Sequence, residues 1–303
     1  MSTAPARPLE PPVWFEPLRS PTWLVPPVGD NAAPVVVCAE PWVEHGVDRP
    51  GRDLRLGFPL YLAEAIRFGT DARAIALRSP VEPGAPMPDA SLVVRTAVAP
   101  DGDGAVRVRI TDPAGSIHSE IVREAHDEPT LVAALESLPH PVSEGIAISG
   151  VRPVWNSLYR APSGAALIAY VRGQGACGRV VEGSLPAGSD PESVAARRAE
   201  TASILKALGS LATSTSEPFT AMVFFGALLA AYDAGSSVVG EFRLQANARC
   251  TTATDPVDPV YAMAALVMRV FGDLSWSARR IEGLRPAASP AMQQWLDRIE
   301  AVT

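Results

Sequence analysis

The stretch SLVVRTAVAPDGDGAVRVRITDPAGSIHSEIVRE (91–124) decides the fold of the first half of the chain. Segments 91–99, 105–112 and 116–124 are rich in valine and isoleucine, and in the last two apolar residues alternate with polar ones. Such alternation is typical of half-buried strands, and the Asp-Gly pairs of residues 100–104 favour a hairpin turn. The stretch therefore predicts three consecutive antiparallel strands.

The flanking segments extend this pattern in both directions. PVVVCA (34–39) is a short apolar run typical of a buried strand, and residues 72–78 alternate like a second strand. Residues 54–68 have helical spacing, in which Pro59 indicates a kink or a late start. A further helix is expected at 128–138, with a proline in its permitted first turn. The order predicts a small α/β sandwich over residues 34–140.

After about residue 150 the strand pattern gives way to helical spacing. Short connections between these segments favour antiparallel helix pairs, so we expect a linker (141–160) followed by an all-helical domain (161–303). The overall fold class is thus an α+β domain followed by an α domain. The apolar run 219–232 is shorter than the ~20 residues that span a bilayer, which predicts a buried core helix and no membrane span. The predicted helices are 162–180, 192–212, 218–234, 238–252, 258–272, 274–284 and 289–302.

A proline-rich arm (1–33) precedes both domains. Its prolines disfavour helix and ladder hydrogen bonds, so the arm is expected to be extended. Trp14, Phe15 and Trp23 can anchor it on the same chain or on a partner in the manner of a proline-rich ligand. Burying one such side chain contributes about 1.5–3 kcal/mol. We expect the arm to pack across the α/β domain and the start of the helical half.

Composition and charge limit the class of protein. At about 150 residues per domain, 303 residues correspond to two domains. The net charge is −7 and the 26 basic residues are scattered, which excludes a nucleic-acid footprint. Three cysteines cannot form a disulfide framework in a chain of this length. The first residues hold no apolar signal segment, so a cytoplasmic location is expected.

The sequence contains no recognisable catalytic or metal-binding motif. None of the four histidines has metal-ligand spacing to a second histidine or a cysteine. Gly173-Gln174-Gly175-Ala176-Cys177-Gly178 is spelled like a phosphate loop but follows a helical pattern instead of a strand. We therefore expect no enzymatic activity, no cofactor and no metal. Acidic, aromatic and imidazole groups gather after the first strand, where α/β folds hold ligands, at Glu40, Trp42, Glu44 and His45.

Several stretches resemble a known combination of domains. Residues 35–42, 91–124 and 127–138 are similar to the TolB N-terminal domain, in the form found upstream of tetratricopeptide repeats in bacterial signalling proteins. Residues 161–175 resemble the linker and first helix that lead into such repeats, and residues 255–285 resemble one tetratricopeptide unit. The likeness departs from the family where a proline-rich loop replaces a helix between the second and third strands.

This resemblance implies a non-catalytic protein–protein interaction, scaffold or regulatory protein of a bacterial signalling or multiprotein system. Partner proteins would contact exposed aromatic and arginine side chains, because these dominate interface energetics. The alternative is a small-ligand sensor or accessory subunit that uses the cleft near Glu40–His45. The expected partner-binding residues are Trp14, Trp23, Arg269, Trp276, Arg279 and Arg280.

Overall fold

The computed structural model describes residues 8–26, 28, 34–40, 49–77, 80–81, 90–99, 104–154, 159–182 and 190–302. The chain forms two compact units. We call Met1–Val13 with Pro26–Gly175 the sheet unit, and Trp14–Val25 with Ala176–Thr303 the helical unit. Helix α4 (Ala165–Glu182) contributes residues to both.

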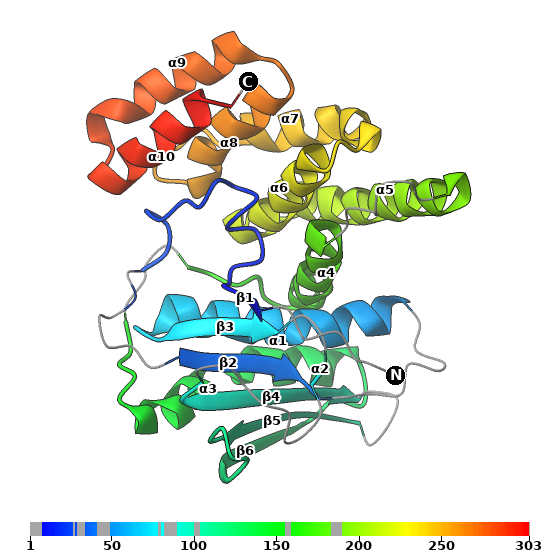
Figure 1. The fold of residues 1–303 in the computed structure, drawn as a ribbon, viewed down its shortest axis with the longest axis vertical. Helices are drawn as coiled ribbons and strands as arrows, with labels where there is room; N and C mark the ends of the chain where they lie inside the picture. The colour runs from blue at the N-terminus through cyan, green and yellow to red at the C-terminus, as the bar shows by residue number, and fades with distance from the viewer. Residues whose placement is uncertain are drawn as a thin grey trace. The chain divides into compact units, whose positions relative to one another are not determined.

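The sheet unit contains a six-stranded mixed sheet with the order β1-β3-β2-β4-β5-β6 (Figure 1). Strand β2 runs parallel to β3 and β4, whereas β4, β5 and β6 form an antiparallel meander. The short β1 pairs antiparallel with β3. The meander and both upstream strands are thus confirmed, and the first half is a mixed α/β structure as predicted. The strands are β1 (Pro8–Leu9), β2 (Pro34–Ala39), β3 (Arg73–Leu77), β4 (Leu92–Ala99), β5 (Ala105–Thr111) and β6 (Ile117–Glu124).

Three helices cover one face of this sheet. They are α1 (Arg49–Gly69), α2 (Glu128–Ser137) and α3 (Pro139–Ile146), and α1 contacts β2, β3 and β4 while α2 and α3 contact β5 and β6. The contact is close at Gly145, where an added Cβ would lie 2.4 Å from Cδ1 of Ile110. The buried, alternating side chains of β5 therefore point to the helical layer.

Two expectations for these helices need correction. Helix α1 begins at Arg49, not at residue 54, and continues through Pro59. Its neighbours Phe58 and Leu60 are buried, so packing of the apolar face outweighs the hydrogen bond that proline cannot donate. Residues 141–160 do not form a simple linker, because α3 includes the first of them and a 3₁₀ turn follows at Ala147–Ser149.

The opposite face of the sheet carries its own apolar cluster. Val36, Cys38, Leu77 and Val93 pack there with Val81, whose carbonyl accepts a hydrogen bond from Arg95 Nη1 (3.1 Å). Of the proline-rich loop predicted at 79–89, only residues 80 and 81 are among the described residues.

Helices α1 and α4 touch through their backbones. A Cβ added to Gly57 would lie 1.8 Å from the Val171 carbonyl oxygen, and one added to Gly175 would lie 2.3 Å from the Asp53 carbonyl oxygen. Gly175 is therefore a helix-packing glycine. The stretch spelled like a phosphate loop lies inside a helix, as its sequence context predicted.

The described part of the helical unit beyond α4 is built from consecutive helices, which confirms the predicted helical second half. Four of their N-termini have side-chain caps, which are followed by proline at Asp190, Asp258 and Ser289 but not at Asp273. The helices are α5 (Pro191–Ser214), α6 (Pro218–Asp233), α7 (Arg243–Thr252), α8 (Pro259–Val270), α9 (Leu274–Leu284) and α10 (Pro290–Glu300). Residues Ser237–Phe242, expected to be α-helical, form a 3₁₀ segment instead.

Helix α6 forms the centre of the helical unit. Its residues from Phe219 to Leu229 are all buried, as predicted for the apolar run. A search of the described residues finds no helix that is long and apolar enough to cross a membrane.

A segment from the N-terminal arm covers part of α6. We call Trp14–Val25 the strap. The Trp14 side chain has no exposed surface, its ring centroid lies 5.9 Å from that of Phe219, and its Cβ lies 2.6 Å from a Cβ added to Gly226. The strap thus occupies space that a side chain at Gly226 would fill.

Hydrogen bonds fix the other end of the strap. Trp295 Nε1 on α10 donates to the Leu18 carbonyl oxygen (2.9 Å), and Arg19 forms a two-pronged ion pair with Asp233 (2.7 and 2.8 Å). The Trp23 and Trp295 rings meet edge to face at 5.8 Å. The arm therefore packs on its own chain, and in the helical unit it contacts α6 and α10 rather than the start of that unit. Residues 8 and 9 meanwhile form β1 in the sheet unit.

Trp14→Ala should lower the free energy of unfolding by about 3–5 kcal/mol, because it removes a fully buried aromatic side chain and leaves a cavity. Urea denaturation followed by circular dichroism measures the change. Glu16→Ala, an exposed change in the same strap, should stay within about 0.5 kcal/mol of the parent. Equal stability of the Trp14→Ala variant and the parent would contradict the packing of the strap.

Gly175→Ala should destabilise the chain by about 1–3 kcal/mol, since the new methyl group would meet the backbone of α1. Gly283→Ala in α9 is the matched control, because its Cβ would meet only Tyr261 Oη at 4.0 Å. That control should be neutral or stabilising by up to about 1 kcal/mol, from helix propensity alone. Thermal unfolding of both variants distinguishes backbone contact from propensity.

Candidate functional site

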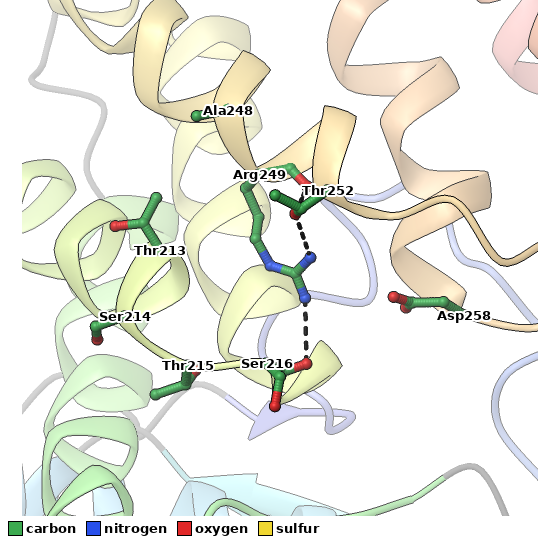
Figure 2. Close-up of a pocket in the computed structure, with 8 residues that line it drawn as sticks. All are labelled: Thr213, Ser214, Thr215, Ser216, Ala248, Arg249, Thr252 and Asp258. Atoms are coloured by element: carbon green, nitrogen blue, oxygen red, sulfur yellow. Dashed lines mark hydrogen bonds between the residues drawn. The ribbon is translucent and has the colours of Figure 1, made fainter.

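The candidate site is a pocket of about 490 Å³ in the helical unit. It lies between the C-terminal end of α5 and the segment that includes the end of α7 and the start of α8 (Figure 2). One arginine and one aspartate are its charged residues, and the others are small or carry hydroxyl groups. The lining residues are Thr213, Ser214, Thr215, Ser216, Ala248, Arg249, Thr252 and Asp258.

The wall of hydroxyl residues results from the way α5 ends. Thr213 Oγ1 donates to the Gly209 carbonyl oxygen (2.9 Å), and Ser214 Oγ and Thr215 Oγ1 both donate to that of Leu211 (3.0 and 3.3 Å). Such bonds compete with the helical ladder and help to terminate the helix. These three hydroxyl protons are consequently already used.

Arg249 is the central residue of the pocket. It is only 6% exposed, although a guanidinium is ordinarily kept in water. Nη1 donates to Thr252 Oγ1 (3.1 Å) and Nη2 to the Ser216 carbonyl oxygen (3.4 Å), while the buried Nε has no acceptor. Among the residues that the structure describes, no carboxylate pairs with this guanidinium. Figure 2 shows it between Thr213 and Ser214 on one side and Asp258 on the other.

Asp258 and Ser216 supply the remaining free polar atoms. Asp258 caps α8, with Oδ1 accepting from the Val260 N–H (2.8 Å). Within the described residues Oδ2 has no hydrogen-bond donor. The Ser216 hydroxyl likewise makes no hydrogen bond there, and Ser216 is exposed. The pocket therefore offers the N–H groups of Arg249 that make no hydrogen bond, the Ser216 hydroxyl, and one carboxylate oxygen of Asp258 without a donor.

The cysteine next to the pocket is not activated as a nucleophile. The cysteine that follows Arg249 in α7 is buried, and burial raises the pKa of the Cys250 thiol to about 12 despite the opposing effect of Arg280 and Arg249. The thiol is therefore protonated at neutral pH and is a poor nucleophile. Searching the described residues also finds no group of three acidic, histidine or cysteine side chains that could hold a metal ion.

The predicted partner-binding arginines and tryptophan of the helical unit have different surroundings. Arg269 donates to the carbonyl oxygens of Val302 and Glu300, at the end of α10. The guanidinium of Arg280 lies 3.5 Å from the ring centroid of Tyr261 and 4.7 Å from that of Trp276. Arg269, Arg280 and Trp276 thus stabilise contacts between helices of this chain.

Arg279 is the exception, because it is exposed and has no partner among the described residues. Trp14 and Trp23 lie in the strap, where the Trp14 ring is fully covered by the chain itself. Of the predicted partner-binding residues, the structure brings Arg280 and Trp276 together on α9.

The cleft predicted in the sheet unit can be traced at one residue only. Trp42, Glu44 and His45 lie outside the described residues. Glu40 accepts from Arg109 Nη1 (3.0 Å), and the Nε of the same arginine donates to Glu120 (2.7 Å). The Glu40 carboxylate is thus held by a cation of the sheet, which reduces its capacity to bind a ligand cation.

A buried carboxylate on α1 was not singled out from the sequence. Glu64 has no exposed surface and accepts a hydrogen bond from Tyr170 Oη on α4 (2.5 Å). Burial, with Glu64 as a second cause, raises the pKa values of Tyr170 and Tyr159 well above their usual range. This polar network joins α1 to the helix that covers it. In the sequence, the sign of such a site was a glutamate within a helical segment of mostly apolar residues.

Arg249 was also not predicted as a site residue, although its position along the helix marks it as unusual. The buried residues of α7 are Ala246, Arg249 and Cys250, which have the spacing of an apolar helix face. A charged residue at such a position must be paired or must serve a function. The pattern thus identifies the arginine as unusual, although it does not show which loop encloses it.

Comparison of the chain with protein-family models, curated proteins and solved structures gives no match in any of the three. The resemblance to TolB-like domains and tetratricopeptide repeats therefore remains a prediction, and the geometry of the site carries the functional argument.

Arg249→Met should leave the ligand-free protein equally stable or more stable, because it replaces an incompletely paired buried charge by an apolar side chain of similar length. Arg280→Met is the matched control, since Arg280 donates to two carbonyl groups and stacks on two rings. The control should lose about 1–3 kcal/mol. Urea denaturation in anion-poor buffer measures both; a larger loss at Arg249 than at Arg280 would show that Arg249 is an ordinary structural residue.

The stability contributed by Cys250 should fall as pH rises from about 8.5, the pKa of a thiol in the unfolded chain, to about 12, its pKa in the folded protein. In this window the unfolded chain releases the proton while the folded chain keeps it, so unfolding is favoured by about 1.4 kcal/mol per pH unit. Urea denaturation of the parent and of Cys250→Ala between pH 8 and 10 should give a shallower decline for the variant. Parallel curves would contradict the raised pKa.

Proposed function

We propose that this chain is a non-catalytic binding protein whose helical unit recognises a small anionic ligand in the Arg249 pocket. One observation carries the proposal: a guanidinium that is 6% exposed lines a pocket of about 490 Å³, and its buried Nε lacks an acceptor. The function belongs to the class of small-ligand sensors or accessory subunits. Its site lies in the helical unit instead of the cleft near Glu40.

The buried charge of Arg249 is energetically costly. Removing a guanidinium from water costs several kcal/mol unless an anion and full hydrogen bonding compensate. The Thr252 hydroxyl and the Ser216 carbonyl provide two neutral acceptors for Arg249. An anion in the pocket would supply the missing charge. Pockets of about 300–1,000 Å³ commonly receive small molecules.

Binding of an anion should raise the melting temperature of the full chain. A ligand at 100 times its dissociation constant stabilises the folded state by about 2.7 kcal/mol, which corresponds to several degrees for a unit of this size. We expect a thermal-shift screen of small carboxylates, phosphates and sulfonates to give at least one such shift. Arg249→Met should abolish the response, whereas Arg279→Met, the same change at an exposed arginine, should retain it.

The proposal fails if no anion stabilises the parent protein, or if the Arg249→Met variant responds to the same degree. Circular dichroism of both variants establishes beforehand that the helices are intact.

A second candidate function is that of a protein-interaction scaffold, with a TolB-like domain followed by degenerate tetratricopeptide-like helices in a cytoplasmic bacterial signalling system. It is supported by an exposed apolar pair that we call the Leu244 patch. Leu244 on α7 is 83% exposed and Val194 on α5 is 49% exposed. Arg198, four residues after Val194, pairs with Glu241, which precedes Leu244 by three residues (3.2 Å). Apolar side chains bordered by charges are typical of interface centres.

Leu244→Glu tests this second function against a matched control. Leu274→Glu makes the same change at a residue of α9 that is 50% exposed. Affinity purification from the source cell should recover a partner with the parent and with Leu274→Glu, but not with Leu244→Glu. Equal recovery with both variants would exclude the Leu244 patch as the contact.

A further inference from the structure

The charges that line the Arg249 pocket restrict the class of its ligand. Arg249 is the cationic side chain of the wall and Asp258 the anionic one. Both line the same pocket, yet the structure forms no ion pair between them within the described residues. Figure 2 shows the Asp258 carboxylate directed towards the Arg249 side of the pocket. A ligand that fits between them meets one positive and one negative group.

The donors available near Arg249 suit a carboxylate. The hydroxyl protons of Thr213, Ser214 and Thr215 already bond to carbonyl groups of α5, and Thr252 Oγ1 donates to the Arg249 carbonyl (2.8 Å). The Ser216 hydroxyl and the N–H groups of Arg249 that make no hydrogen bond remain to donate to a ligand. The single positive charge of the pocket lining matches the single negative charge of a carboxylate, whereas a phosphate group brings up to two negative charges.

Asp258 favours a ligand that also carries a positive group. Its Oδ1 is occupied by the Val260 N–H (2.8 Å), which leaves Oδ2 to accept from an ammonium. The same carboxylate opposes a second negative charge in the pocket by like-charge repulsion. A net-neutral ligand with both signs therefore fits better than a dianion.

We propose that the pocket binds a small zwitterion of the amino-acid class, with its carboxylate on Arg249 and Ser216 and its ammonium on Asp258. This inference rests on the proposed function of the pocket as an anion-binding site. The wall is made of hydroxyl groups and the methyl groups of alanine and threonine, and the volume of about 490 Å³ leaves room for a side chain of moderate size.

Isothermal titration of the full chain with each of the twenty common amino acids tests the inference. At least one should bind, and its N-acetyl and carboxamide derivatives should each bind at least tenfold more weakly, because each lacks one of the two charges. Propionate and inorganic phosphate serve as anions without an ammonium group, and both should bind more weakly than the amino acid.

Two variants test which side chain of the pocket binds each charged group of the ligand. Arg249→Met should abolish binding of every probe. Asp258→Asn keeps a side-chain oxygen to cap α8, because asparagine is an equally good N-cap. This variant should bind the amino acid at least tenfold more weakly than the parent does. Its affinity for propionate should be unchanged or higher. A melting temperature near that of the parent shows that the Asp258→Asn variant is folded.

The outcomes separate this inference from the proposed function. If propionate or phosphate binds through Arg249 but amino acids bind no better, the zwitterion is excluded while the anion site stands. The same holds if Asp258→Asn changes the affinities for the amino acid and for propionate equally. If no probe binds the parent, both are overturned.

Discussion

Complete coverage of α6 is the constraint on which the helical unit depends. From Phe219 to Leu229 every residue of this helix is buried, so apolar surface must be provided on all of its sides. Neighbouring helices α5 and α8 contact α6, and the strap lies at Gly226 with the Trp14 side chain. An N-terminal segment that forms no core of its own thus completes the core of the C-terminal helices.

The periodicity of the sequence was sufficient to locate most strands and helices. Alternation in 105–112 predicts β5 because residues on one face of a sheet recur every second position. Periodicity does not show which surface covers a given side chain. The aromatic character of Trp14 indicated that the same chain or a partner would cover it, but not that α6 does so. The passage of α1 through Pro59 likewise depends on packing that follows only from the assembled layers.

The candidate site was less accessible to sequence reasoning than the fold. Arg249 has the spacing of a buried residue, but its enclosure requires the end of α5 to approach from residues 213–216, a tertiary contact with no local sequence signal. Glu40 was recognised as a candidate, yet its ion pair with Arg109 (3.0 Å) crosses the sheet from another strand. In both cases the chemistry of a side chain depends on a partner that is distant in sequence.

The position of the strap has a consequence for the order in which the chain can fold during synthesis. Leu18 and its hydrogen-bond donor Trp295 are separated by 277 positions. The ribosome releases the strap long before α10, since chains emerge from the N-terminus. The helical unit can therefore reach its final packing only after α10 has been translated. Until then the Leu18 carbonyl oxygen lacks its donor on α10.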